Sequence, residues 1–146
     1  MSALAPAGAL LELVLAVVLA AGPANAVSGP ALDYTLECAG CHRADGSGTP
    51  GSVPALRDSV ARFLAVPGGR EYLARVPGAA QAPLDDAALA AVLNWMLDHF
   101  DAANVPSGFI PYTGAEVGPL RARPLVDVEG TRKQLLERIA PPKTQQ

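Results

Sequence analysis

The sequence has few aromatic side chains, few charges and almost no cysteine. Phe, Trp and Tyr make up 5% of its 146 residues, charged residues make up 17%, and there are two cysteines. Eleven basic and fourteen acidic residues give a formal net charge of -3, and the basic residues form no cluster, so we expect no nucleic-acid partner. Half of the residues are hydrophobic, which excludes a disordered chain and predicts one small folded domain. With so few large rings, its core must be small or be filled by something else.

The first 26 residues have the pattern of an export signal. A short apolar run from Ala9 to Ala21 contains a single charge, Glu12, and no Lys or Arg precedes it. Gly22 and Pro23 then end the helical pattern, and Ala24-Asn25-Ala26 provides the small residues that a signal peptidase recognises. The run is shorter than the roughly 20 residues that span a bilayer, so an uncleaved anchor is the less favoured alternative. We expect cleavage after Ala26, export to the periplasm and no stable membrane insertion afterwards.

The strongest motif is Cys38-Ala39-Gly40-Cys41-His42. Two cysteines at this spacing can form a redox disulfide, half of a zinc site, or two thioether anchors for haem. The histidine directly after Cys41 favours haem, because in c-type attachment both thiols bond to the vinyl groups and the adjacent imidazole is the proximal iron ligand. A zinc site needs two more ligands, and His99 is the one other histidine. A thioredoxin-like dithiol lacks its strand-rich context. We therefore expect one covalent haem c.

With this motif, the chain resembles the monohaem c-type cytochromes of the single-domain helical type over about residues 29–100. The resemblance implies an all-α, cytochrome c-like fold with short helices around one haem. It also implies that Tyr34 lies on a first helix leading into the motif, and that the glycine-rich loop 45–51 passes the haem edge. The carbonyl of Pro54 is expected to accept a hydrogen bond from His42 and so to orient the imidazole. The residues expected to bind the haem are Cys38, Cys41, His42 and Pro54.

Apolar residues at helical spacing predict further helices over residues 58–66, 70–76 and 131–139. A longer helix is expected after Pro83, with Asp85 or Asp86 as its N-cap. Its apolar stripe comprises Leu89, Val92, Leu93, Met96, Leu97 and Phe100. The resemblance implies that this helix crosses the first one, where Trp95 meets Tyr34. No pattern of period two predicts a strand.

The sequence departs from the family pattern at the sixth iron ligand. The family places a methionine on the loop before the last helix of its core, and residues 76–84 contain none. Met96 is the one thioether of the chain after signal cleavage and is the leading candidate, although a Met in an apolar stripe is also typical of a core. An open or water-bound iron, His99 and Lys133 are the alternatives. His/Met ligation suits electron transfer, whereas an open iron can bind a small ligand.

Residues 105–146 are expected to form a C-terminal extension of a loop and short helices, after a signal peptide (1–26) and a cytochrome c domain (27–104). Thr113 to Glu116 have capping-box spacing, but Gly118 and Pro119 are expected to stop that helix within about a turn. Arg121 and Arg123 are expected to be solvated surface residues rather than partners of haem propionates. The extension is either a cover or a docking surface.

These features together predict an exported single-haem electron carrier that is not an enzyme. Its partners are expected to be redox proteins: a periplasmic donor such as a dehydrogenase, and an acceptor cytochrome or oxidase. Two alternatives remain open. One is a haem enzyme or gas-binding module with an open distal iron site, and the other is a fixed electron-transfer subunit of a larger dehydrogenase.

Overall fold

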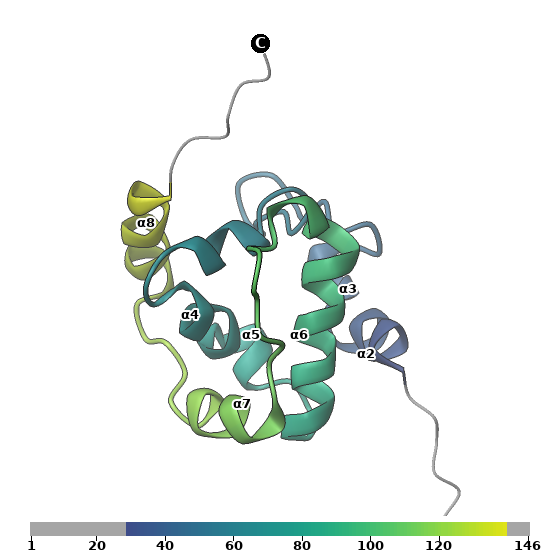
Figure 1. Ribbon diagram of the computed structural model, residues 1–146. Helices are drawn as coiled ribbons and strands as arrows, with labels where there is room; N and C mark the ends of the chain where they lie inside the picture. Colours follow the sequence, from purple (N-terminus) through teal and green to yellow (C-terminus); the bar gives the residue numbers. More distant parts are fainter. Residues whose placement is uncertain (1–28, 140–146) are drawn as a thin grey trace, which may run out of the picture.

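The computed structural model describes residues 29–139, and the predicted signal peptide lies outside this range. The fold is all-α, as expected, and extended pairing within the described residues is limited to one isolated bridge between Thr49 and Val53. Between residues 29 and 139 no helix has the length and apolar composition needed to cross a bilayer. The elements, in chain order, are α2 (Pro30–Glu37), α3 (Ala39–His42), η1 (Ala61–Ala65), α4 (Gly69–Arg75), α5 (Pro77–Ala80), α6 (Asp86–Asp101), η2 (Ala102–Asn104), α7 (Gly114–Arg121) and α8 (Val128–Arg138) (Figure 1).

Helix α6 is the longest helix of the described chain and packs against both α2 and α7. It begins where the sequence predicts, because the Asp85 carboxylate accepts a hydrogen bond from the Ala88 amide (2.7 Å) and satisfies a free backbone donor of the first turn. All six residues of the predicted apolar stripe are buried. The stripe therefore forms the centre of the hydrophobic core.

Helix α2 crosses α6 through aromatic contacts, as the resemblance implies. The Tyr34 ring centroid lies 5.2 Å from that of Trp95 and 5.1 Å from that of Phe100. Tyr34 is 1% exposed. Contacts of this kind between tilted rings contribute about 0.5–1.5 kcal/mol beyond the area that they bury. The crossing fixes the end of α2, from which the cysteine motif continues.

Two sequence predictions were wrong in detail. In place of the expected helix over 58–66 the structure has the shorter 3-10 helix η1, and a right-handed helix cannot include Asp58, whose φ is +54°. Its first amide, on Ala61, donates instead to the buried carboxylate of Asp101 (2.7 Å). Helix α7 was expected to stop near Gly118, yet it continues through Pro119 to Arg121. Fully buried Val117 packs in the core, so tertiary contacts stabilise α7 where its own backbone hydrogen bonds are incomplete.

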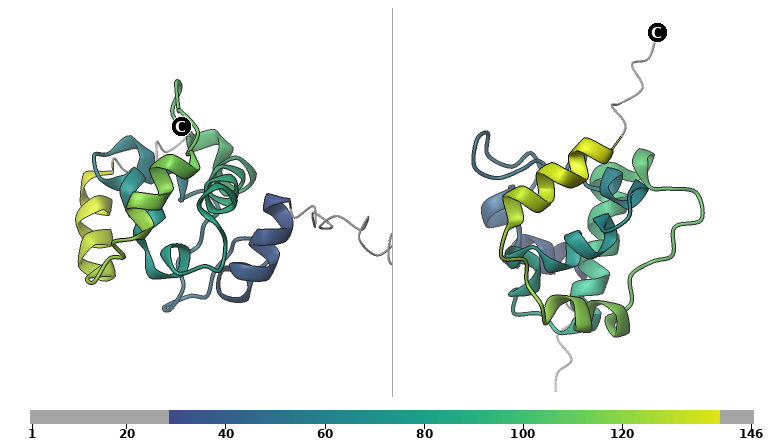
Figure 2. Two further views of the ribbon diagram at one scale, coloured as in Figure 1. Left: turned by 90° about the horizontal axis from the view of Figure 1, so that it is seen from below. Right: turned by 90° about the vertical axis from the view of Figure 1, so that its left-hand side faces the viewer.

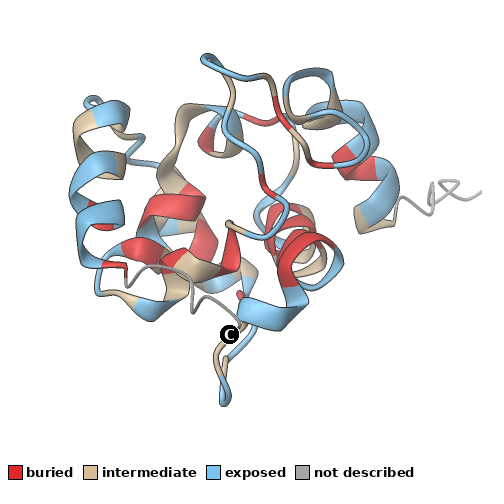
Figure 3. Ribbon diagram, turned by 90° about the horizontal axis from the view of Figure 1, so that it is seen from above, coloured by how far each residue is buried: buried red, intermediate tan, exposed pale blue. Residues whose placement is uncertain are grey.

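The C-terminal segment wraps around the side of the molecule opposite α2 (Figures 1 and 2). Helix α8 starts at Val128, three residues before the predicted start, because the Asp127 carboxylate accepts from the Gly130 amide (2.8 Å). Leu135 and Ile139 are buried and belong to the main core cluster. Buried residues gather on the inward sides of the helices, while the outer surface of α8 is exposed (Figure 3).

Candidate functional site

Both cysteines and the adjacent histidine lie on one helical turn. Helix α2 ends at Glu37, and the Cys38 amide still donates to the Tyr34 carbonyl (2.9 Å). The next turn is α3, in which the His42 amide donates to the Cys38 carbonyl (3.0 Å). Neither thiol is in a disulfide; that of Cys38 is half-buried and that of Cys41 is exposed. Both sulfurs are therefore available for thioether bonds.

The electrostatics of Cys38 argue against the redox-dithiol alternative. Burial raises the pKa of its thiol above the ordinary value, and the nearby Glu37 and Asp33 carboxylates raise that pKa further. A redox-active Cys-x-x-Cys pair needs the opposite shift, because the thiolate is the attacking species. Cys38 thus remains a neutral thiol at neutral pH.

The His42 imidazole is held in the state that can bind iron. Its Nδ1 lies 3.1 Å from the carbonyl oxygen of Pro54, the contact that the resemblance implies. A carbonyl can only accept a hydrogen bond, so Nδ1 carries the proton and the lone pair is on Nε2. Burial lowers the pKa of His42, with the Pro54 hydrogen bond opposing the shift, so the neutral ring is favoured at pH 7. A neutral imidazole with its second nitrogen bonded to a carbonyl is a typical oriented metal ligand.

The glycine-rich loop places the Pro54 carbonyl beside His42. The Gly48 amide donates to the His42 carbonyl (3.0 Å), and Thr49 and Val53 exchange two backbone hydrogen bonds of 2.9 Å. Gly48 has a φ of +67°, and a Cβ there would collide with the carbonyls of Val53 and Pro54. Glycine is therefore required at position 48, because a side chain would push away the carbonyl that orients the imidazole.

The donor set of this turn fits a haem c. It offers two free thiols and one neutral imidazole, and Cys38 and Ala39 pack against the hydrophobic core. In the part of the chain that the structure describes, no group of three or more His, Cys, Asp or Glu side chains could hold a metal ion, so the zinc alternative has no support. Haem would be held by bonds to Cys38 and Cys41 and by His42 Nε2.

The three sixth-ligand candidates lie in different surroundings. Met96 is 8% exposed and belongs to the core cluster. His99 is exposed and stacks on Trp95, with ring centroids 4.4 Å apart and an interplanar angle of 14°. Lys133 is exposed on α8. The segment 76–85 forms the single turn of α5 and a short loop, and contains no Met, His, Lys or Cys.

Arg121 has a role that the sequence did not reveal. It was expected to be solvated, but its side chain is only 14% exposed. Its guanidinium donates to three carbonyls of the segment before α6, those of Ala80 (3.0 Å), Ala82 (2.5 Å) and Leu84 (2.5 Å). Arg121 thereby holds this segment to the C-terminal extension. Backbone acceptors have no sequence signature, so no motif could have predicted the contact.

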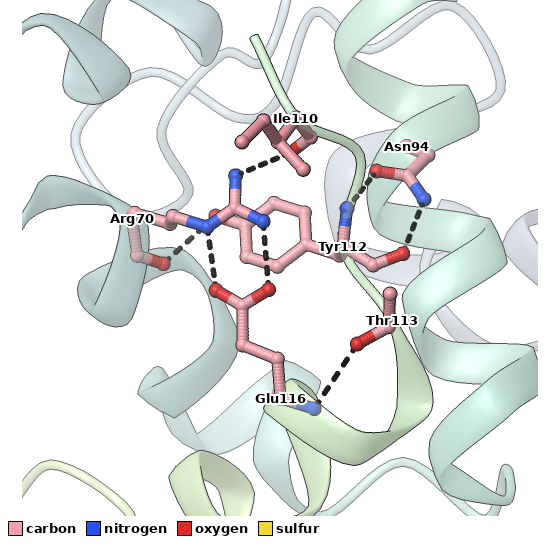
Figure 4. A network of polar contacts seen from close by, with 6 residues as sticks. All are labelled: Arg70, Asn94, Ile110, Tyr112, Thr113 and Glu116. Atoms are coloured by element: carbon pink, nitrogen blue, oxygen red, sulfur yellow. Dashed lines mark hydrogen bonds and ion pairs between the residues drawn. The ribbon is translucent and has the colours of Figure 1, made fainter.

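Arg70 joins the extension to α4 (Figure 4). Its Nε and Nη2 bind both carboxylate oxygens of Glu116 (2.5 and 2.7 Å), and its Nη1 donates to the Ile110 carbonyl (2.8 Å). The guanidinium also lies over the Tyr112 ring, 4.0 Å from the centroid. Asn94 on α6 exchanges two hydrogen bonds with the backbone of Tyr112 (2.9 and 2.8 Å). The segment 110–116 is thus bound to two helices that precede it.

The chain is similar to two curated proteins from Thermus thermophilus, each of which is a Cytochrome c-552. The first is 38% identical over 141 residues, a match that covers 83% of this chain and 95% of that protein. The second is 39% identical over 119 residues, covering 68% of this chain and 91% of the relative. No family model matches the chain. The first match extends over 141 positions but includes only about 121 residues of this chain, which is 83% of 146. About 20 residues of that relative therefore have no counterpart in this chain.

Proposed function

The chain belongs to the c-type cytochromes and is a haem electron-transfer protein, and from this premise we propose that it is exported and works in the periplasm. It takes one electron from a donor such as a dehydrogenase and passes it to an acceptor cytochrome or oxidase. A carrier of this kind makes and breaks no substrate bond, in keeping with an electron carrier rather than an enzyme. The apolar run and the Ala24-Asn25-Ala26 site support export, with 1–26 as the signal peptide.

The hydrogen bond between His42 and Pro54 is the observation that carries the assignment of the site. Cys38 and Cys41 form the thioether bonds, His42 binds iron through Nε2, and Pro54 fixes the ring orientation. The haem supplies the reversible one-electron couple when it is bound. The chain's own contribution is to keep the imidazole neutral and aligned, which makes it a better donor to the metal.

The chain after the signal peptide divides into a cytochrome c domain (27–104) and an extension (105–146). We assign the extension the role of a cover that is fixed to the domain. Its attachment supports this assignment: Glu116 of the extension binds Arg70 on α4, and the Arg121 side chain, only 14% exposed, binds the segment before α6.

The experiment that tests the assignment is expression with the haem-attachment machinery, followed by mass measurement and haem staining after denaturing electrophoresis. The wild-type mass should be that of residues 27–146 plus one haem. Replacing both Cys38 and Cys41 by Ala should abolish the stained band, whereas His42→Ala should keep the band and change the visible spectrum. A colourless wild-type product with both thiols open to alkylation would refute the assignment.

We assign Met96 as the sixth ligand. Its position as the one thioether after residue 26 supports the assignment. In Met96→Ala the far-red charge-transfer band of the oxidised protein should disappear and the midpoint potential should fall. Leu93→Ala, which is also buried in the same stripe, controls for the cavity. If both variants keep the wild-type band, Met96 is a core residue only.

A second candidate function is the binding of a small ligand at an open iron site. The absence of Met, His, Lys and Cys from segment 76–85 favours it. This function requires that the reduced wild-type protein bind carbon monoxide rapidly and that the oxidised protein be high-spin. A low-spin spectrum without rapid binding excludes it and leaves the electron carrier.

A further inference from the structure

A stack of aromatic rings leads from the surface into the crossing of α2 and α6. His99 is exposed, and its ring lies almost parallel to that of half-buried Trp95. Trp95 in turn contacts the fully buried Tyr34, with centroids 5.2 Å apart. Here one continuous set of contacting rings joins an exposed side chain to a buried one.

The buried end of this stack touches the haem-attachment turn at two points. The Tyr34 hydroxyl donates to the carbonyl of Arg43 (2.7 Å), the residue that follows His42. The Tyr34 carbonyl accepts from the amide of Cys38 (2.9 Å). The first contact leads through one peptide unit to His42, and the second leads directly to Cys38. Electronic coupling falls steeply across empty space and less steeply through bonds, hydrogen bonds and contacting rings, so the arrangement suits electron transfer.

We propose that Trp95 and Tyr34 form a path for electrons between the haem site and the protein surface at His99. The inference rests on the proposed function and adds a second point of electron entry and exit besides the haem edge. One electron leaves the reduced haem and arrives at an oxidised one-electron acceptor at the His99 surface, and no proton moves. Transfer in the opposite direction reduces the haem.

The rings act as a medium and are not themselves oxidised. The Tyr34 hydroxyl donates to a carbonyl, which cannot take up the proton that an oxidised tyrosine must release. Burial raises the pKa of Tyr34 to about 12, so the phenol also stays protonated before any transfer. The path therefore depends on contact between the rings, and it should be sensitive to the loss of one ring in the series.

The test uses the haem-loaded protein with a photoactive ruthenium complex bonded to His99. His42 is bound to the haem, so the label has one histidine available in the described chain. A laser flash reduces the haem through the label, and the rate is read from the haem absorbance. Trp95→Leu should slow this transfer several-fold, whereas Trp95→Tyr, which keeps a ring, should retain most of the rate. Tyr34→Phe, which removes the hydrogen bond to Arg43, should slow it less than Trp95→Leu.

Phe109→Leu is the matched control, because it removes a half-buried ring in the extension, outside this stack. The midpoint potential and the unfolding temperature of each variant separate coupling from driving force and from damage to the fold. Wild-type rates in folded Trp95→Leu and Tyr34→Phe, at unchanged potential, would overturn the proposal. If Trp95→Leu does not fold, the flash-induced transfer rates of Trp95→Tyr and Tyr34→Phe test the proposal instead. A product without haem shows no flash-induced haem signal and so refutes the proposed function itself.

Discussion

Replacing Glu116 by Gln should weaken the attachment of the extension to α4. The carboxylate accepts from both Nε and Nη2 of Arg70, and the two side chains are 33% and 27% exposed. An exposed ion pair contributes about 0.2–1 kcal/mol, and a hydrogen bond to a charged group about 1.5–3 kcal/mol. For this partly buried pair we expect a loss of about 1.5 kcal/mol. Gln keeps the shape but turns an amide donor toward the guanidinium, which has no acceptor.

The pH dependence provides the sharper part of this prediction. Hydrogen bonds from Arg70 lower the pKa of Glu116 below its ordinary value. The stabilisation is therefore fully present above the pKa that Glu116 has in the unfolded chain. It is lost as pH falls through the lower pKa that Glu116 has in the folded protein. The difference in unfolding free energy between the wild type and Glu116→Gln should be greatest at pH 7 and should shrink at more acidic pH.

Urea denaturation of the haem-loaded protein, measured at pH 7 and in steps toward acid, provides the assay. A loss of about 1.5 kcal/mol corresponds to a fall of about 6 °C in the unfolding temperature for a domain of this size. Glu137→Gln, on an exposed position of α8, should behave as the wild type. A variant that matches the wild type at pH 7, or a difference that stays constant on acidification, would refute the reasoning.

Three further predictions concern the caps and loops around the site. Asp85→Ala removes the N-cap of α6 and should lower the unfolding free energy by about 1 kcal/mol in urea, whereas Asp98→Ala, exposed on the same helix, should change it little. Gly48→Ala should lower the unfolding free energy by about 1–2 kcal/mol because of the positive φ at this position alone. It should also shift the midpoint potential, because the added Cβ displaces the Pro54 carbonyl. Arg121→Ala should lower the unfolding free energy by about 2 kcal/mol and speed hydrogen exchange at the amides of residues 80–82, 84 and 85. Arg121→Lys should recover part of both losses, and unchanged exchange would show that the segment is stable without Arg121.

The sequence predicted the centre of the fold well because local signals and burial agree there. Asp85 is a strong N-cap, and the apolar stripe after it has helical period over about three turns. The meeting of Tyr34 and Trp95 came from the family resemblance, and the ring contacts confirm it. The predictions were less accurate for short helices and irregular segments. At Asp58 a left-handed residue, which apolar spacing does not reveal, kept the expected helix from starting there.

In the extension, local signals gave the wrong answer for α7. Gly118 and Pro119 are poor helix residues, and their local preferences predict a stop. The helix continues because Val117 is buried in the core and Glu116 is bound to Arg70, a residue 46 positions earlier. Long-range contacts of this kind outweigh a local cost of a few kcal/mol. They are not visible in a window of neighbouring residues.

The chemistry of the cofactor followed from five consecutive residues, because two thiols and an imidazole on one turn have few uses. The family resemblance implied the all-helical class, and hydrophobic period, a local property, predicted individual helices and no strand. Only the tertiary structure decided how segment 110–121 contacts the helices and loop that precede it in the chain. Arg121 binds carbonyl oxygens that every residue possesses, and Arg70 finds Glu116 across the fold. Such contacts depend on where the folded backbone brings distant residues together, and no short stretch of sequence predicts that placement.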